Sequence, residues 1–377
     1  MKIALVHDFL TQNGGAEKVL LAFKKAYPEA PIYVLFADKQ KFANTFSPSD
    51  IKESFLAKMP LILSKYRYYL SMMPSAIESL NLNDYDVVLS SVSAFAKGVI
   101  TKPETVHVSY CHTPTRYLWS DSHEYVENLK MPGFMKRILE LQLNKLRVWD
   151  KLAAERVDYF VANSHIVKDR IAKYYNRPST VIYPPVETNK FYITDKPGAY
   201  YLAGGRLVPY KRFDLIIDAF NRLALPLVIY GDGPEYENLR KRAKSNIRFV
   251  TGQLSDADLT RLYSEAIAYI QPQLEDFGIT AVESMASGRP VIAYAKGGSL
   301  ETVKEGVSGT FFKHQDWADL VDAVMRFRPE DYDAQTIKQY AERFSVENFK
   351  TQISNFVNEK HQEKKDAIAN QQIQMKL

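Results

Sequence analysis

The sequence predicts an α/β fold in two domains, and three observations carry that prediction. Short apolar runs alternate along the chain with segments whose apolar residues recur at helical spacing. The alternation stops at the adjacent Pro184 and Pro185, which cannot both lie inside a sheet, and then starts again. A chain of 377 residues is also long for one hydrophobic core. We therefore expect one domain over residues 1–185 and a second over residues 186–345.

The composition is that of an ordinary soluble globular protein, with 46% hydrophobic and 25% charged residues. The single cysteine, Cys111, rules out an internal disulfide and fits a reducing compartment. Charges soon interrupt the apolar run of residues 3–6, which predicts a first strand and not a signal peptide. No stretch approaches the roughly 20 apolar residues of a membrane span. We therefore expect a cytoplasmic protein.

The net charge of +5 is unevenly spread. Residues 1–185 hold 24 Lys and Arg against 18 Asp and Glu, whereas the remainder is nearly balanced. This excess suggests that the first domain meets something anionic, such as a lipid phosphate or a membrane surface. An ordinary solvated surface explains it equally well.

The first domain opens with a strand at residues 2–7, followed by a loop and a helix beginning near Gly15. A helix start behind a glycine-rich turn can receive phosphate. The adjacent Gly14 and Gly15 are not the pattern G-x-G-x-x-G, however, so simple loop closure is an equal alternative.

After a second strand, at residues 30–37, residues 54–80 mix helical apolar spacing with basic and aromatic side chains. Pro60 and Pro74 predict two short helices there. Such a surface can bind nucleic acid, lie on a membrane or simply pack. The charge balance argues against nucleic acid, which leaves an acceptor lipid near a bilayer and a tyrosine-rich packing surface as the alternatives. The basic and aromatic residues are Lys58, Lys65, Tyr66, Arg67, Tyr68 and Tyr69.

Further strands are expected at residues 86–91 and 107–112. Cys111 and His112 are neighbours on a strand and point to opposite faces, so they cannot form a nucleophile–base pair. We interpret Cys111 as core. His112 stands at the carboxyl end of its strand, where open α/β sheets place their sites.

A long basic amphipathic helix is predicted over residues 133–156, and its apolar residues could be core or a membrane-facing stripe. Core is the usual answer. The last strand of the first domain is expected at residues 159–164, and residues 181–191 are interpreted as the linker. The apolar residues of the helix include Met135, Ile138, Leu139, Leu141, Leu146 and Trp149.

In the second domain a strand near residues 199–204 leads to a loop that holds two cations, Arg206 and Lys211. A guanidinium and an ammonium at the end of a strand suit a diphosphate. Further along, an apolar run ending at Pro272 is followed by a loop with two carboxylates, then Phe277-Gly278, then a helix. The free N–H groups of Ile279 and Thr280 would form an anion site at that helix start.

The spacing of Glu275 and Glu283, with Phe277-Gly278 between them, resembles the signature of the family 4 glycosyltransferases, which are retaining enzymes. Gly-Arg-Leu followed by Lys, here Gly205 to Lys211, resembles the diphosphate clamp of that family. The resemblance implies the GT-B fold, in which two Rossmann-like domains face each other across a cleft. It also implies that a C-terminal helix, over residues 346–368, crosses back to the first domain.

The resemblance also assigns residue roles. The catalytic residues would be His112, Glu275, Arg206 and Lys211. The donor would be bound by Gly15, Gly205, Arg206, Lys211, Gly231, Gln253, Leu254, Glu275, Phe277, Gly278, Ile279, Thr280 and Glu283. The acceptor would be bound by Gly14, Lys65, Arg67, Tyr68, Lys97, Arg116 and Tyr117.

The runs YLSMMPSAIESL and CHTPTRYLW are similar to a subgroup of bacterial mannosyltransferases of surface-polysaccharide assembly. This implies GDP-mannose as donor, a lipid-linked glycan as acceptor, and peripheral contact with the inner face of the membrane. The alternatives are a UDP-sugar donor, a GT-B sugar-nucleotide epimerase, and a protein that binds sugar nucleotides without catalysis. A dehydrogenase is disfavoured, because neither half has G-x-G-x-x-G followed by an acidic residue.

Many sugar transferases bind a divalent metal through Asp-x-Asp, and this chain has three such pairs. None is expected at the carboxyl end of a strand that faces a site, and His and Cys show no metal spacing. We therefore expect transfer without a metal or other cofactor. The three pairs are Asp84 with Asp86, Asp256 with Asp258, and Asp331 with Asp333.

Overall fold

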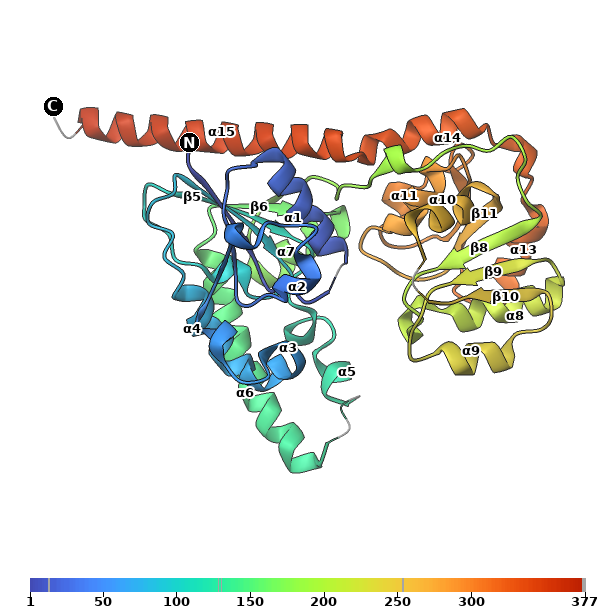
Figure 1. Cartoon of the computed structure of the whole chain (residues 1–377), viewed down its shortest axis with the longest axis horizontal. Helices are drawn as coiled ribbons and strands as arrows, with labels where there is room; N and C mark the ends of the chain where they lie inside the picture. The colour runs from blue at the N-terminus through green and yellow to red at the C-terminus, as the bar shows by residue number, and fades with distance from the viewer. Residues whose placement is uncertain (13, 128, 130, 253, 375–377) are drawn as a thin grey trace. The chain divides into compact units, whose positions relative to one another are not determined.

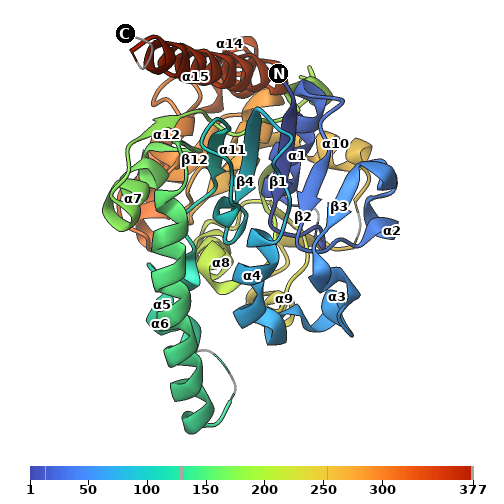
Figure 2. The same ribbon diagram turned by 90° about the vertical axis from the view of Figure 1, so that its left-hand side faces the viewer.

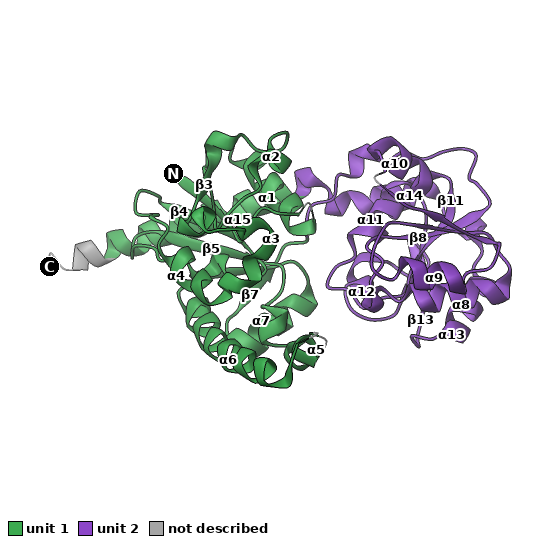
Figure 3. Cartoon of the chain, turned by 60° about the horizontal axis from the view of Figure 1, so that its bottom comes forward, with its two compact units in different colours: residues 1–183, 349–377 green, residues 184–348 purple. Residues whose placement is uncertain are grey.

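The computed structural model describes residues 1–12, 14–127, 129, 131–252 and 254–374, with side chains as far as residue 370 (Figure 1). It divides into two compact units. Unit 1 comprises residues 1–183 and 349–377, and unit 2 comprises residues 184–348 (Figure 3).

Unit 1 contains a seven-stranded parallel sheet within the described residues, in the order β3-β2-β1-β4-β5-β6-β7. Its central strands are aliphatic runs buried on both faces, as parallel sheets covered by helices require. The strands are β1 (Ile3–His7), β2 (Ile32–Val34), β3 (Ile51–Glu53), β4 (Val87–Val92), β5 (Val106–Cys111), β6 (Tyr159–Ala162) and β7 (Ser179–Val181).

Helices cover both faces of this sheet (Figures 1 and 2). The α-helices are α1 (Gly15–Ala26), α2 (Lys39–Phe42), α3 (Ile62–Lys65), α4 (Met73–Glu78), α5 (Ser122–Glu127), α6 (Gly133–Glu155), α7 (His165–Tyr175) and the later part of α15 (Val346–Gln374). Short 3-10 helices lie between them, namely η1 (Pro48–Asp50), η2 (Phe55–Lys58), η3 (Tyr66–Met72), η4 (Ala96–Gly98) and η5 (Arg116–Leu118).

Unit 2 contains a six-stranded parallel sheet in its described part, in the order β10-β9-β8-β11-β12-β13. The strands are β8 (Tyr200–Gly204), β9 (Leu227–Tyr230), β10 (Ile247–Val250), β11 (Ala266–Gln271), β12 (Val291–Tyr294) and β13 (Gly309–Phe312). Its helices are η6 (Thr188–Lys190), η7 (Pro209–Lys211), α8 (Phe213–Leu223), α9 (Tyr236–Arg242), α10 (Asp256–Ser264), α11 (Ile279–Ala286), α12 (Ser299–Thr302), α13 (Trp317–Arg326), η8 (Pro329–Asp331), α14 (Ala334–Ala341) and η9 (Glu342–Phe344).

The two parallel sheets with their covering helices confirm the predicted α/β fold. Each sheet reverses its direction of growth once, between β1 and β4 in unit 1 and between β8 and β11 in unit 2. The loops that leave such a pair of strands diverge to opposite faces, which opens a crevice at the carboxyl ends where ligands bind.

Three local expectations need correction. Residues 54–80 form four short pieces, η2, α3, η3 and α4, and not two helices, because Pro74 begins α4 instead of ending a helix. The last strand of unit 1 is β7, which pairs with β6 and has only three residues. The C-terminal helix runs to Gln374, beyond the predicted end at residue 368.

Helix α6 departs most from the expectation that its apolar residues are core. Leu146 is buried, and Leu139 and Trp149 pack against the core of unit 1, but Ile138 and Leu141 are exposed. Cys111 is buried, as expected. Across the part of the chain that the structure describes, none of the helices has the length and apolar content that a membrane crossing requires.

Candidate functional site

The crevice of unit 2 is marked by an ion pair between the two diverging loops. Lys211 follows β8 and Glu275 follows β11, and the Lys211 ammonium donates a hydrogen bond to Glu275 Oε1. Both side chains are largely buried, at 13% and 15% exposure. The sheet order therefore brings together two residues that the sequence separates by 64 positions.

The second predicted cation, Arg206, is exposed on the loop between Gly205 and η7. This loop is fixed against the neighbouring one, because Leu207 N donates to Asp232 O over 2.9 Å. Gly231 has a φ of +120°, and a Cβ there would lie 2.0 Å from Gly205 O. Only glycine fits such a close backbone approach in the left-handed region.

Helix α11 begins at the same edge of the sheet. Its N-cap, Gly278, has a φ of +96° and no side-chain cap, so the amides of Ile279 and Thr280 have no acceptor within the helix. The loop before it is held by a hydrogen bond of 2.8 Å from Gly298 N to Glu275 O. Buried Phe277 packs on Phe344 with ring centroids 5.3 Å apart. The N-terminus of α11, with free amides and a loop fixed by these contacts, suits the binding of an anionic group.

Glu283 lies on α11, four residues after its first residue Ile279, and is only 6% exposed. Tyr263 donates a hydrogen bond of 3.0 Å to its Oε2, and Tyr263 OH is 2.5 Å from Tyr230 OH. Burial raises the pKa of Tyr269, which donates to Gly204 O, to about 12. Burial also raises the pKa of Tyr230 and of Tyr263 well above the ordinary value, so these tyrosines stay protonated. Tyr263 therefore orients Glu283, and Tyr269 orients the end of β8.

Two predicted donor contacts fall near the end of β10. Gln253 lies outside the described residues, and Leu254 is half-buried beside it. Gly252 has a φ of +90°, and its amide donates to Asp232 Oδ2 over 2.9 Å. Asp232 thus ties the β9 and β10 loops together, a role that the sequence did not reveal.

In unit 1 the crevice between β1 and β4 is organised by a buried aspartate that sequence reasoning missed. The Asp8 carboxylate accepts four backbone hydrogen bonds of 2.6–2.8 Å, from the amides of residues 93–96. These amides lead into η4, which begins at Ala96, so Asp8 fixes the loop after β4 to the end of β1. The available signal was an acidic residue directly after a buried strand, in the run VHDF.

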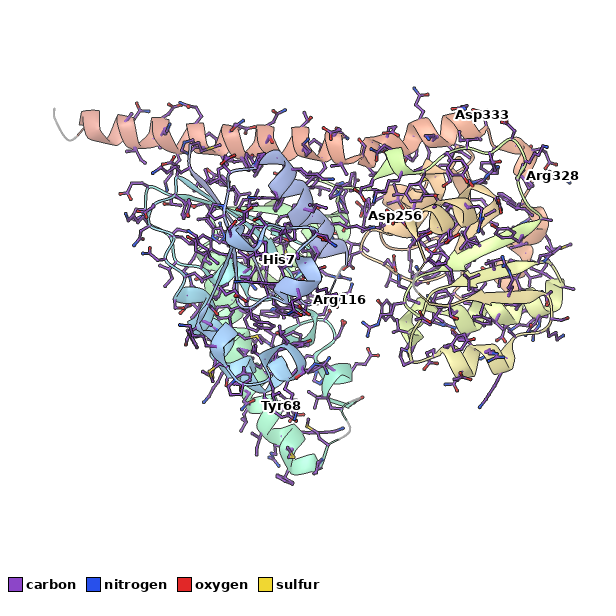
Figure 4. The ribbon with its side chains drawn as sticks, viewed as in Figure 1. His7, Tyr68, Arg116, Asp256, Arg328 and Asp333 are labelled. Atoms are coloured by element: carbon purple, nitrogen blue, oxygen red, sulfur yellow. The ribbon has the colours of Figure 1, made fainter. Side chains whose placement is uncertain are left out.

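His112 belongs to a polar relay in this crevice, which we define as Glu17, His7, Ser91 and His112. His112 Nε2 is 2.9 Å from Ser91 Oγ, which is 3.1 Å from His7 Nδ1. His7 Nε2 in turn is 3.8 Å from Glu17 Oε1. Burial, with a smaller contribution from His7, lowers the pKa of His112 to about 3. His112 is therefore neutral near pH 7 and held in one orientation (His7 is labelled in Figure 4).

The glycines before α1 join the same relay. Gly14 is the N-cap of α1, and its amide donates to Glu17 Oε2 over 2.9 Å, while Gly15 is the first helical residue. A Cβ at Gly14 would lie 3.1 Å from that carboxylate oxygen. The predicted glycine pair thus lies at a helix start linked to His112 through Glu17.

The predicted acceptor residues separate into two groups. Lys65, Arg67 and Tyr68 are exposed, and Tyr68 reaches 82% exposure (Figure 4). Arg116 and Tyr117 are half-buried in η5.

Lys97 does not fit an acceptor surface. Its ammonium is fully buried and donates to Asp150 Oδ1 and Ala94 O, each over 2.5 Å. Asp150 also accepts from Thr115 Oγ1 and Trp119 Nε1, at 2.9 and 2.8 Å. The structure assigns Lys97 to a core ion pair that joins η4, α6 and the loop after β5.

The Asp-x-Asp pairs have structural partners. Asp86 accepts from Lys2 N, Asp258 accepts from the hydroxyl of Ser255, and Asp333 caps α14 by accepting from Thr336 N. Among the described residues, no three His, Cys, Asp or Glu side chains gather as metal ligands would. The metal-free reaction stays a prediction.

Both halves of the chain match known families. Residues 13–190 match Glycosyltransferase Family 4, and residues 187–344 match Glycosyl transferases group 1. The chain is 27% identical over 212 residues to the D-inositol 3-phosphate glycosyltransferase of Mycobacterium sp. (strain KMS), which is 48% of each chain. It is 25% identical over 304 residues to the mannosylfructose-phosphate synthase of Agrobacterium fabrum (strain C58 / ATCC 33970), covering 69% of this chain and 65% of that one. The match thus spans about half the length of the first of these relatives.

Solved structures share the fold. Anabaena Alr3699/HepE in complex with UDP superposes with a TM-score of 0.71 at 17% identity, over 95% of this chain and 100% of that one. The sucrose-phosphate synthase of Thermosynechococcus elongatus superposes with a TM-score of 0.68 at 16% identity, over 95% of this chain and 99% of that one. Two parallel sheets, two matching domains and these neighbours together show a GT-B, family 4-like glycosyltransferase, in which a Glycosyltransferase Family 4 domain is followed by a Glycosyl transferases group 1 domain.

Proposed function

We propose that this protein is a retaining glycosyltransferase that moves a hexose from a nucleotide diphosphate sugar to a lipid-linked glycan. The observation that carries the proposal is the Lys211–Glu275 pair at the β8/β11 crevice, beside the uncapped start of α11. In this proposal the diphosphate lies against this positive charge and these amide donors, and the carboxylate beside them meets the sugar hydroxyls.

The chemistry asks the protein to stabilise a leaving diphosphate. An ammonium has three N–H donors, so Lys211 can keep its bond to Glu275 and still donate to phosphate. Exposed Arg206 can add a planar pair of donors, and the α11 amides with the helix dipole add further positive potential. The bond from the anomeric carbon to phosphate oxygen breaks as the bond to the acceptor oxygen forms, and the acceptor proton passes to the diphosphate.

GDP-mannose is the donor that we propose first, with mannose as the transferred sugar. Two features support it, the subgroup resemblance of residues 69–80 and 111–119 and the similarity to a mannosylfructose-phosphate synthase. We place the acceptor near unit 1, where Lys65, Arg67 and Tyr68 are exposed, and the protein at the cytoplasmic face of a membrane. In this assignment the reaction needs no metal.

A UDP-sugar is the second candidate donor. HepE, whose fold this chain shares, has been solved with UDP, with UDP and glucose, and with UDP-glucose. UDP-glucose therefore belongs in the same test.

A thermal-shift panel of GDP, UDP and ADP, each with its common sugar conjugates, tests the donor. A ligand at 100 times its Kd stabilises the folded protein by about 2.7 kcal/mol, which gives a clear rise in Tm. A shift with GDP and GDP-mannose alone supports the mannose assignment. A shift with UDP alone overturns that assignment and keeps the reaction class, whereas no shift with any nucleotide contradicts the donor site.

The metal requirement is tested separately by transfer assays in EDTA. We expect the rate of transfer to be unchanged. Loss of the rate in EDTA with recovery in magnesium would overturn the metal-free assignment.

A further inference from the structure

Helix α6 carries apolar side chains on two opposite faces. One face packs into unit 1 through residues such as Leu143, Leu146 and Ala153. On the other side lies a row that we call the exposed stripe, made of Phe134, Ile138, Leu141, Lys145, Val148 and Leu152. Its five apolar members are between 52% and 68% exposed.

The stripe is continuous along the helix. Its members are spaced alternately by four and three residues, which at 100° per residue keeps them within about 80° of the helix circumference. Figure 2 shows α6 extending as a rod away from the sheet of unit 1. Among the described residues of unit 1, no packing explains why five large apolar side chains lie in one row in contact with water.

The charges around the stripe are mainly positive. Lys145 lies within it, Arg137 lies about 60° from its centre, and Lys151 lies about 100° from its centre. Of the three acids on α6, Asp150 is buried on the opposite face and Glu140 lies about 120° from the centre. Glu155, the last residue of the helix, lies about 60° from the centre and is 3.9 Å from the Lys151 ammonium. An apolar row flanked by long cationic side chains matches the boundary between acyl chains and anionic headgroups.

A second copy of the chain fits this row less well. In a parallel pair of helices Lys145 would face its own copy, and in an antiparallel pair it would face Leu141. In both arrangements an ammonium is placed in the seam without an acidic partner from the stripe, which weakens helix pairing. At a bilayer the same side chain reaches a lipid phosphate.

We propose that the exposed stripe of α6 docks unit 1 onto an anionic lipid bilayer. The proposal deepens the proposed function, because it assigns the surface that meets the membrane in which a lipid-linked acceptor would lie. Its observations are those of α6 alone, so its test does not need the acceptor.

The test is co-sedimentation of the full chain with two kinds of vesicle, phosphatidylcholine alone and phosphatidylcholine with an equal part of phosphatidylglycerol. We expect binding to the anionic vesicles, weakened at high salt. The variant Ile138→Glu with Leu141→Glu should bind at least about tenfold more weakly, because two apolar side chains that the bilayer would bury become charged. Arg137→Gln with Lys145→Gln should lose about fivefold for each cation and keep the weak binding to neutral vesicles.

The matched control is Met325→Glu on α13 of unit 2, which changes a side chain that is 70% exposed and should leave vesicle binding unchanged. Equal binding of wild type and the stripe variant would overturn the proposal. So would a wild-type dimer that becomes monomeric in the stripe variant without any vesicle binding, since a second copy would then be the occupant. A nucleotide-induced thermal shift on the same samples reports on the donor site separately.

Discussion

Lys211 is the single side chain on which the proposed reaction depends most. It connects the two loops of the β8/β11 crevice through Glu275. In the proposed reaction it also supplies charge for the leaving diphosphate. We expect Lys211→Ala to reduce kcat by about 10²–10³-fold, the range seen when one preorganised donor to a developing oxyanion is removed. Steady-state transfer assays measure this, with exposed Lys241→Ala on α9 as the control. Normal turnover by Lys211→Ala would show that the clamp assignment is wrong.

Ser91 acts on the site through another residue, because its hydroxyl lies between His7 and His112. We expect Ser91→Ala to lower kcat about tenfold, which corresponds to loss of one hydrogen bond that orients His112, with little change in the donor KM. Ser91→Thr retains the hydroxyl and should recover most of the rate. If Ser91→Ala lowers the Tm while kcat stays normal, the relay is a packing feature only.

Gly278 shows how one position shapes an element, the start of α11. Alanine there would adopt an unfavourable φ of +96°, and its Cβ would lie 2.6 Å from Gln271 Nε2. We expect Gly278→Ala to lower the free energy of unfolding by about 1–3 kcal/mol and to abolish the nucleotide-induced thermal shift. Gly306→Ala is the control, because Gly306 has a φ of +70° with open space around it. Equal effects of the two variants on stability and nucleotide binding would contradict a special role for Gly278.

The sequence predicts elements well where one periodicity dominates. The helix of residues 213–223 buries Phe213, Ile216 and Phe220 as its spacing indicates. The same reasoning fails for helix α6, because its apolar residues form two opposite rows and the spacing does not show which row is buried. Strand β7 is too short to show a pattern.

The residues of the candidate site likewise fall into those that the sequence predicts and those that it does not. Glycines and the Phe277-Gly278 turn are visible as local motifs, since their conformational demands are local. The Asp8 cap joins residues 85 to 88 positions apart, and the Lys97–Asp150 pair joins residues 53 positions apart. No local pattern reports such partners, so the sequence predicts Lys97 as an acceptor-binding residue and does not show its buried ion pair.

The stability of the whole molecule should fall in mild acid because of a buried histidine. Burial lowers the folded-state pKa of His107 to about 3, from an ordinary value of 6.5. Below pH 6.5 the unfolded state binds a proton that the folded state does not, so the stabilisation is complete above that pH and is lost as the pH falls towards 3. We expect a loss of about 1.4 kcal/mol per pH unit from this group. Urea titrations between pH 7 and about 5 measure it, and His107→Gln should remove this share of the slope and leave the share of His112, whose pKa burial also lowers to about 3. An unchanged slope in that variant would contradict the assignment.

The two units are built from different parts of the chain. Unit 2 is one continuous segment, whereas unit 1 needs residues 349–377 in addition to residues 1–183. Helix α15 buries Phe349, Ile353 and Val357, and the Phe349 ring lies 5.8 Å from that of Phe23 and 5.7 Å from that of Tyr110. Burial of three such side chains contributes roughly 5–9 kcal/mol, which is comparable to the total stability of about 5–15 kcal/mol of a typical domain.

A chain that ends at residue 348 should therefore lose the folded state of unit 1 and keep that of unit 2. Calorimetry should show one cooperative transition in place of two, and any nucleotide that shifts the full chain should still shift the remaining transition, because the Lys211 loop and α11 lie wholly in unit 2. A chain ending at residue 370 is the control and should keep both transitions, since the three core contacts are retained. If the chain ending at residue 348 still shows both transitions, α15 is an accessory of unit 1 and its apolar face does not decide whether that unit folds.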